Sequence, residues 1–82
     1  MTFAEAIETP KAGWKYANEE QLLAALAENL ARHCCLNAQK VFEWAQKHSN
    51  YRDLRKASKR LIANAAKMEL LVAVLNDEPL GN

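Results

Sequence analysis

The sequence predicts an all-α protein: a long antiparallel helical hairpin preceded by a short amino-terminal helix or arm. Glycine and proline occur only at Pro10, Gly13, Pro79 and Gly81, so the usual chain-breaking residues are missing from the long stretch between them. Within that stretch apolar residues recur at helical spacing, and no strand-like alternation is present. Eighty-two residues, fifteen of them alanine, predict one small domain of closely packed helices over residues 1–82.

Residues 1–17 are expected to form the amino-terminal arm. Thr2 followed by Glu5 has the pattern of a capping box, which predicts a short helix ending near Glu8. The Pro-Lys-Ala-Gly segment that follows would end this helix, and Trp14 and Tyr16 are expected in irregular structure.

Residues 18–48 are expected to form the first long helix. Asn18 is a favoured N-cap, and Gln21 occupies the capping-box position three residues later. The predicted apolar stripe comprises Leu22, Leu26, Leu30, Cys34, Ala38, Val41, Phe42 and Ala45. Asn37 could cap a new helix, so a break near residues 36–37 is the alternative. The absence of glycine and proline favours one continuous helix.

Residues 50–77 are expected to form the second long helix. Asn50 followed by Asp53 gives a plausible N-cap, and Pro79 lies just beyond the expected end. The predicted seam has heptad spacing and comprises Leu54, Ala57, Leu61, Asn64, Met68, Leu71 and Leu75. Asn64 is the polar member of this seam, and Asn64→Leu is expected to raise thermal stability.

A bare hairpin would leave one apolar face of each helix uncovered. The arm could cover these faces and give a monomeric three-helix domain, or two hairpins could pair into a four-helix bundle. The long seam and the short arm favour the homodimer.

Charge is distributed unevenly along the chain. The net charge is only +1, but residues 37–67 carry a net +6, residues 1–36 a net −2 and residues 68–82 a net −3. In a hairpin this distribution predicts a rod with a basic tip at the turn and an acidic base. Four cations at the start of the second helix, Arg52, Arg55, Lys56 and Lys59, lie opposite the apolar seam. Cations are disfavoured at a helix amino terminus, so helix stability does not explain them.

The predicted partner-binding residues combine these cations with nearby aromatic side chains: Lys40, Trp44, Lys47, Tyr51, Arg52, Arg55, Lys56 and Lys59. Trp44 is expected to be exposed, because it lies off the apolar face of its helix. Such a surface suits an acidic protein partner, and it also suits nucleic acid. A pI near 7.8 is low for a dedicated nucleic-acid-binding protein, and the second helix looks too long and apolar for a recognition helix.

The sequence therefore favours a non-catalytic protein-binding regulator or inhibitor that occupies a partner's surface. Nucleic-acid binding through the basic stripe of the second helix is the alternative. Small, compact chains without catalytic residues are common among phage and mobile-element accessory proteins, which is an association with size and class and not with any motif.

No enzyme, cofactor or metal site is expected. His33, Cys34 and Cys35 resemble zinc ligands, but consecutive helical residues point about 100° apart and cannot converge on one ion. There is no glycine-rich phosphate loop. Two adjacent cysteines exclude a disulfide framework, and no apolar run has the length of a membrane span. We therefore expect a cytoplasmic protein that does not enter membranes.

Overall fold

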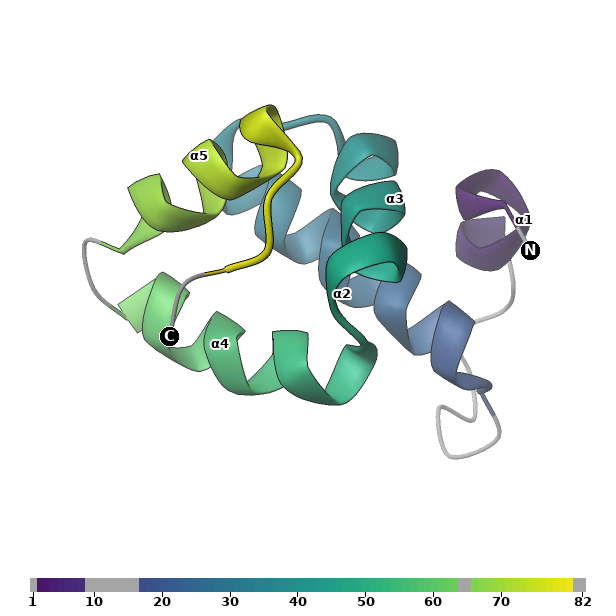
Figure 1. Cartoon of the computed structure of the whole chain (residues 1–82). Coiled ribbons are helices and arrows are strands. Elements are labelled where there is room, and N and C mark those ends of the chain that lie inside the picture. The colour runs from purple at the N-terminus through teal and green to yellow at the C-terminus, as the bar shows by residue number, and fades with distance from the viewer. Residues whose placement is uncertain (1, 9–16, 64–65, 81–82) are drawn as a thin grey trace.

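The computed structural model describes residues 2–8, 17–63 and 66–80, and within them it shows five helices and no strand (Figure 1). The helices are α1 (Phe3–Glu8), α2 (Glu19–Cys34), α3 (Ala38–His48), α4 (Tyr51–Ala63) and α5 (Lys67–Asn76). The prediction of an all-α protein is confirmed. None of the described helices is long and apolar enough to cross a membrane.

The first expected long helix is in fact two helices, so the prediction of a continuous helix is wrong. Cys35 takes the left-handed conformation, with φ at 56°. The Leu36 N–H then donates to the Ala31 carbonyl oxygen at 2.9 Å, which closes the end of α2. Asn37 starts α3, because its side-chain oxygen accepts from the Lys40 N–H at 3.1 Å. The alternative of a break at residues 36–37 is the correct one.

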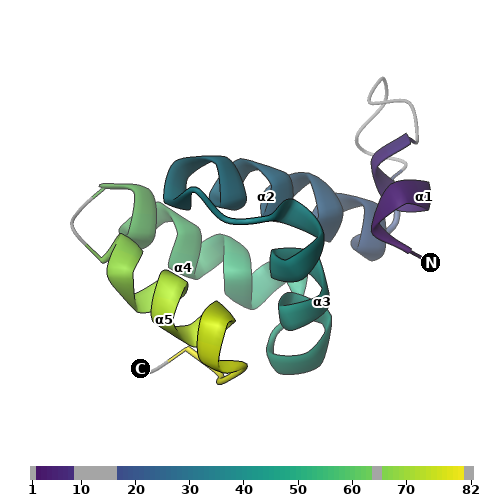
Figure 2. The same ribbon diagram turned by 90° about the horizontal axis from the view of Figure 1, so that it is seen from above.

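The second expected long helix is also divided, into α4 and α5. Figures 1 and 2 show α5 running back in roughly the opposite direction to α4. The reversal lets Leu70, Ala73 and Val74 join the core, whereas a continuous helix would carry them away from α2 and α3. The predicted seam therefore ends with α4, and Met68 and Leu75 are exposed. Asn64, Trp14 and Tyr16 lie outside the described residues.

The predicted helix starts are confirmed by side-chain capping. The Asn18 side chain accepts from the Gln21 N–H at 2.8 Å, and the Gln21 side chain accepts from the Asn18 N–H at 3.0 Å. The Asn50 side chain accepts from the Asp53 N–H at 2.9 Å in the same way. At the start of α1, the Thr2 hydroxyl accepts from the main-chain N–H three residues later at 3.2 Å.

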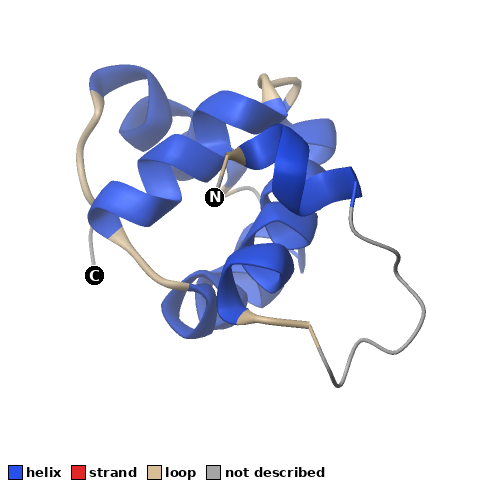
Figure 3. Ribbon diagram, turned by 90° about the vertical axis from the view of Figure 1, so that its right-hand side faces the viewer, coloured by secondary structure: helices blue, strands red, loops and turns tan. Residues whose placement is uncertain are grey.

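Helix α2 lies at the centre and contacts each of the other four helices. It contributes Leu23, Ala24, Ala27, Leu30 and Ala31 to the core. The described helices form a compact arrangement with α1 at one edge (Figures 1 and 2), and Figure 3 shows the molecule from that side. Its overall dimensions are 32 × 22 × 20 Å, so the chain is not the rod that a hairpin would give. The homodimer expected from the sequence stays a prediction.

Candidate partner-binding surface

Four cations form one exposed surface on α4, which we call the basic face: Arg52, Arg55, Lys56 and Lys59. The opposite side of α4 is buried through Leu54, Ser58 and Leu61. Within the described residues, none of the four cations forms an ion pair. The sequence-based placement of these side chains opposite the apolar seam agrees with their exposure.

Local chemistry and packing fix the orientation of this face. Leu54 and Leu61 belong to the hydrophobic core, where α4 packs on α2. The buried Ser58 hydroxyl is satisfied because it donates to the Arg55 carbonyl oxygen at 2.8 Å. Asp53 is the acidic residue in the first turn, where the helix dipole would favour more carboxylates. The cations therefore point outward from a helix that is packed on the core. Their position near its amino end lowers the stability of the helix.

Trp44 does not belong to this surface, so the prediction of an exposed aromatic residue is wrong. Its side chain is only 3% exposed, and its indole N–H donates to the Glu78 carbonyl oxygen at 2.6 Å. The apolar face of α3 is wider than its sequence spacing indicated, because α3 contacts both α2 and α5. The chain after α5 then covers the flank on which Trp44 lies.

Lys47 is also engaged within the fold. Its ammonium group forms an ion pair with an Asp77 side-chain oxygen at 2.5 Å, and His48 Nε2 lies 3.0 Å from the other oxygen. These contacts, with the hydrogen bond from Lys47 first among them, lower the pKa of the Asp77 carboxyl. The carboxyl end of α5 thus meets the carboxyl end of α3. The expected separation of a basic tip from an acidic base is wrong.

Lys40 and Lys47 both line a hollow of about 420 Å³ between α3 and α5, which shares no lining residue with the groove that Lys56 lines. Lys40 is exposed and has no ion pair within the described part of the chain. The eight predicted residues therefore do not form one surface.

Tyr51 lies at the start of α4 and is half-buried. It lines a shallow hollow of about 350 Å³ with Leu22, Ala25, Leu26 and Asn29 of α2. The sequence pattern assigned Leu22 and Leu26 to the apolar stripe of the first expected helix, but both remain partly accessible. An aromatic and apolar patch therefore lies at the α2 side of the basic face.

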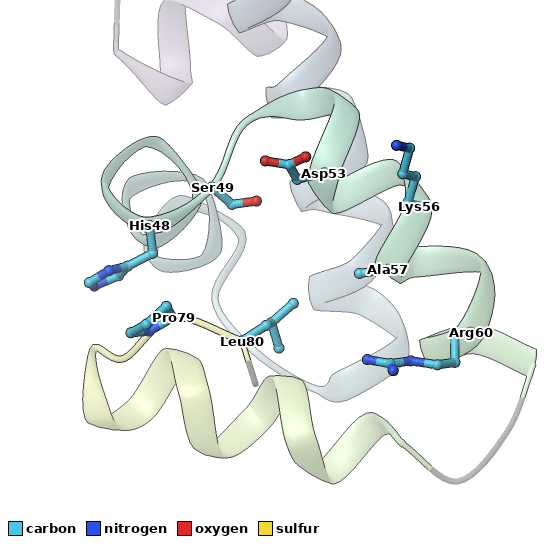
Figure 4. Close-up of a pocket in the computed structure, with 8 residues that line it drawn as sticks. All are labelled: His48, Ser49, Asp53, Lys56, Ala57, Arg60, Pro79 and Leu80. Atoms are coloured by element: carbon cyan, nitrogen blue, oxygen red, sulfur yellow. The ribbon is translucent and has the colours of Figure 1, made fainter. Parts of the chain in front are cut away.

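A groove of about 490 Å³ borders the basic face on its other side (Figure 4). It is lined by His48, Ser49, Asp53, Lys56, Ala57, Arg60, Pro79 and Leu80. Arg60 reaches Glu69 of α5 at 3.3 Å. The sequence reasoning missed this groove, because Pro79 and Leu80 reach it only when the chain turns back after α5. Leu80, an apolar residue just beyond the final helix, was the available signal.

The groove brings a serine, a histidine and an aspartate together without the geometry of a catalytic triad. His48 Nε2 pairs with Asp77, and the Ser49 hydroxyl donates to the Asn50 carbonyl oxygen at 3.4 Å. In Figure 4 the Ser49 hydroxyl points away from the His48 ring. A nucleophilic serine requires a hydrogen bond to its base, and none joins Ser49 to His48 in the described structure.

The three residues that resemble zinc ligands are spread apart at the end of α2. His33 and Cys35 are exposed, whereas Cys34 is partly buried against the core. Burial raises the pKa of the Cys34 thiol, with Lys67 acting in the opposite direction. Among the described residues, no group of three His, Cys, Asp or Glu side chains could hold a metal ion.

The chain matches no protein-family model, no curated protein and no solved structure.

Proposed function

We propose that this protein is a non-catalytic regulator or inhibitor that binds an acidic surface of a protein partner through the basic face of α4. The observation that carries the proposal is a set of four exposed cations on one side of a capped helix, none of which forms an ion pair with another described residue. Three of them lie in the first half of α4, where the helix dipole disfavours them. A binding role explains a charge arrangement that the fold alone does not require. The cytoplasm is the expected compartment, since Cys34 and Cys35 are free thiols.

The chemistry beside the basic face favours a protein partner over nucleic acid. The groove next to Lys56 adds apolar atoms from Ala57, Pro79 and Leu80 to a cationic rim. A protein segment with both carboxylates and apolar side chains would use both parts of this surface. A phosphate backbone would use only the cations, and four cations offer few phosphate contacts.

Nucleic-acid binding remains the second candidate because of one specific observation. Helix α4 has 13 residues and follows α3 after only Ser49 and Asn50. It is therefore short enough for a recognition helix, and the objection raised from the expected long helix no longer applies. Its turn contains no glycine, and the overall charge is only +1.

The test compares two variants with the same loss of charge. One carries Arg52→Ala, Arg55→Ala and Lys59→Ala. The control removes three exposed cations elsewhere, through Arg32→Ala, Lys40→Ala and Lys67→Ala. Each protein is titrated at two salt concentrations against labelled single- and double-stranded DNA and RNA. It is also titrated against a synthetic acidic peptide that alternates glutamate and leucine.

The proposal expects peptide binding that weakens by at least about tenfold in the α4 variant and much less in the control. Equal weakening in both variants would mean non-specific attraction and would refute the role of the basic face. Tight nucleic-acid binding that falls steeply with salt and requires the α4 cations would establish the alternative.

A further inference from the structure

Helix α5 has an apolar stripe on its outward side. Met68, Val72 and Leu75 are 63%, 44% and 55% exposed, and they are the large hydrophobic residues that the described structure leaves exposed. Their spacing of four and three residues places them on one side of the helix. The buried residues Leu70 and Val74 lie on the other side.

Neither the fold nor the proposed function uses this stripe. The basic face belongs to α4, and the inward side of α5 already completes the core against α2, α3 and α4. A helix that is apolar on nearly all sides is normally covered on nearly all sides. The spacing of the stripe is that of a seam between two paired helices.

We infer that the α5 stripe packs against α5 of a second copy of this chain, with the two helices antiparallel. The charges at the two ends of α5 support this arrangement. Glu69 and Asp77 are paired with Arg60 and Lys47, respectively. Lys67 at the amino end and Glu78 just beyond the carboxyl end are exposed and have no ion pair in the described structure.

An antiparallel pair brings the Lys67 end of each copy to the Glu78 end of the other. The dipoles of the two α5 helices then point in opposite directions, so that each positive amino end lies beside a negative carboxyl end. A parallel pair would bring like ends together. The patch is then complementary to itself, as a twofold interface requires. Because each chain carries a net charge of only +1, repulsion between the copies is weak.

The first test is the mass in solution, measured by light scattering after gel filtration over a range of concentrations. The wild-type chain is expected at twice its 9.2 kDa mass, with dissociation on dilution. Val72→Glu should give the monomer mass with an unchanged circular dichroism spectrum, because Val72 is exposed in the monomer. A wild-type monomer at all concentrations, or a dimer that survives Val72→Glu, would overturn the inference.

The α4 variant described above separates this inference from the proposed function. Arg52→Ala, Arg55→Ala and Lys59→Ala should weaken peptide binding at least about tenfold but leave the dimer mass unchanged. Val72→Glu should abolish the dimer but leave peptide binding at the single basic face. Loss of the dimer in the α4 variant would place the interface at the basic face instead.

Disulfide cross-linking tests the antiparallel direction and does not depend on Val72→Glu remaining folded. The background carries Cys34→Ala and Cys35→Asn, because asparagine tolerates the left-handed conformation. Val72→Cys should cross-link to itself near the twofold axis. Met68→Cys should not, since its two copies would be roughly 12 Å apart along the axis. A mixture of Met68→Cys and Leu75→Cys chains should cross-link, and efficient self-linking of Met68→Cys would rule out the antiparallel pair.

Discussion

The indole N–H of Trp44 donates a hydrogen bond of 2.6 Å to the main-chain carbonyl oxygen of Glu78, and this contact fastens the chain after α5 to α3. Trp44→Phe keeps most of the buried apolar surface but leaves that carbonyl without its donor. The free energy of unfolding should fall by about 1–3 kcal/mol, as measured by urea denaturation. The control, Gln46→Ala on the exposed side of α3, should change stability by less than about 0.5 kcal/mol. Equal effects of the two changes would mean that the tail contact adds nothing to stability.

The stability of the fold depends on pH through the Asp77 carboxyl. Its hydrogen bonds to Lys47 and His48 lower its pKa below the ordinary value of 3.8. A carboxyl with a lowered folded-state pKa stabilises the fold above its unfolded pKa and loses this effect as the pH falls through the folded value. The melting temperature of the wild type should therefore exceed that of Asp77→Asn at neutral pH. This difference should shrink progressively below about pH 5.

Lys47→Ala removes the first of the causes that lower the Asp77 pKa, so it should reproduce much of the Asp77→Asn loss over the same pH range. A difference between wild type and Asp77→Asn that stayed constant down to pH 2 would show that Asp77 acts through shape rather than charge.

Cys35 adopts the left-handed backbone conformation, with φ at 56°. Its Cβ atom makes this conformation less favourable for cysteine than for glycine. Cys35→Gly should therefore raise the free energy of unfolding, by about 1 kcal/mol. The matched control is Cys34→Gly, one residue earlier and still helical, which should lower stability by a similar amount. Thermal unfolding of both variants checks the pair. If Cys35→Gly proved destabilising, the side chain of Cys35 would have a stabilising contact that outweighs its backbone strain.

The capped starts of α1, α2 and α4 could be predicted from the sequence, whereas the end of α2 and the start of α5 could not. A capping side chain such as Asn18 or Asn50 acts on an N–H only three residues away, so its pattern is local. The ends of α2 and α5 instead use Cys35 and Asp77, two non-glycine residues in the left-handed conformation. Cysteine gives no signal of this conformation, and aspartate, which adopts it more often than most non-glycine residues, gives only a weak one. The chain reverses there because neighbouring segments then pack on the core, as Leu36 does.

One part of the candidate surface could likewise be predicted from the sequence, and the rest could not. The basic face of α4 follows from helical spacing within eight residues, and its exposure agrees with that spacing. The burial of Trp44 depends on Glu78, which lies 34 residues further along the chain. The groove beside Lys56 likewise requires Leu80 to return to α4. Both features depend on contacts between segments that are far apart in the sequence, so local periodicity could not predict them.

Stability and binding conflict at the start of α4. Arg52 lies in the first turn, near the positive end of the helix dipole. Arg52→Glu should therefore raise the free energy of unfolding by about 1 kcal/mol, while it weakens binding of the acidic peptide. Lys59→Glu makes the same change of charge in the middle of α4, beyond the reach of the dipole. It should weaken peptide binding as well but leave stability within about 0.5 kcal/mol of wild type.

Thermal unfolding and peptide titration of both variants would decide between a structural and a binding role for these cations. Residues retained for binding can lower stability, so a more stable but binding-deficient Arg52→Glu protein is the expected outcome. If Arg52→Glu instead unfolded more easily, the Arg52 side chain would have a structural contact that outweighs the dipole. If it became more stable and bound the peptide as well as before, the basic face would be only a solvated surface.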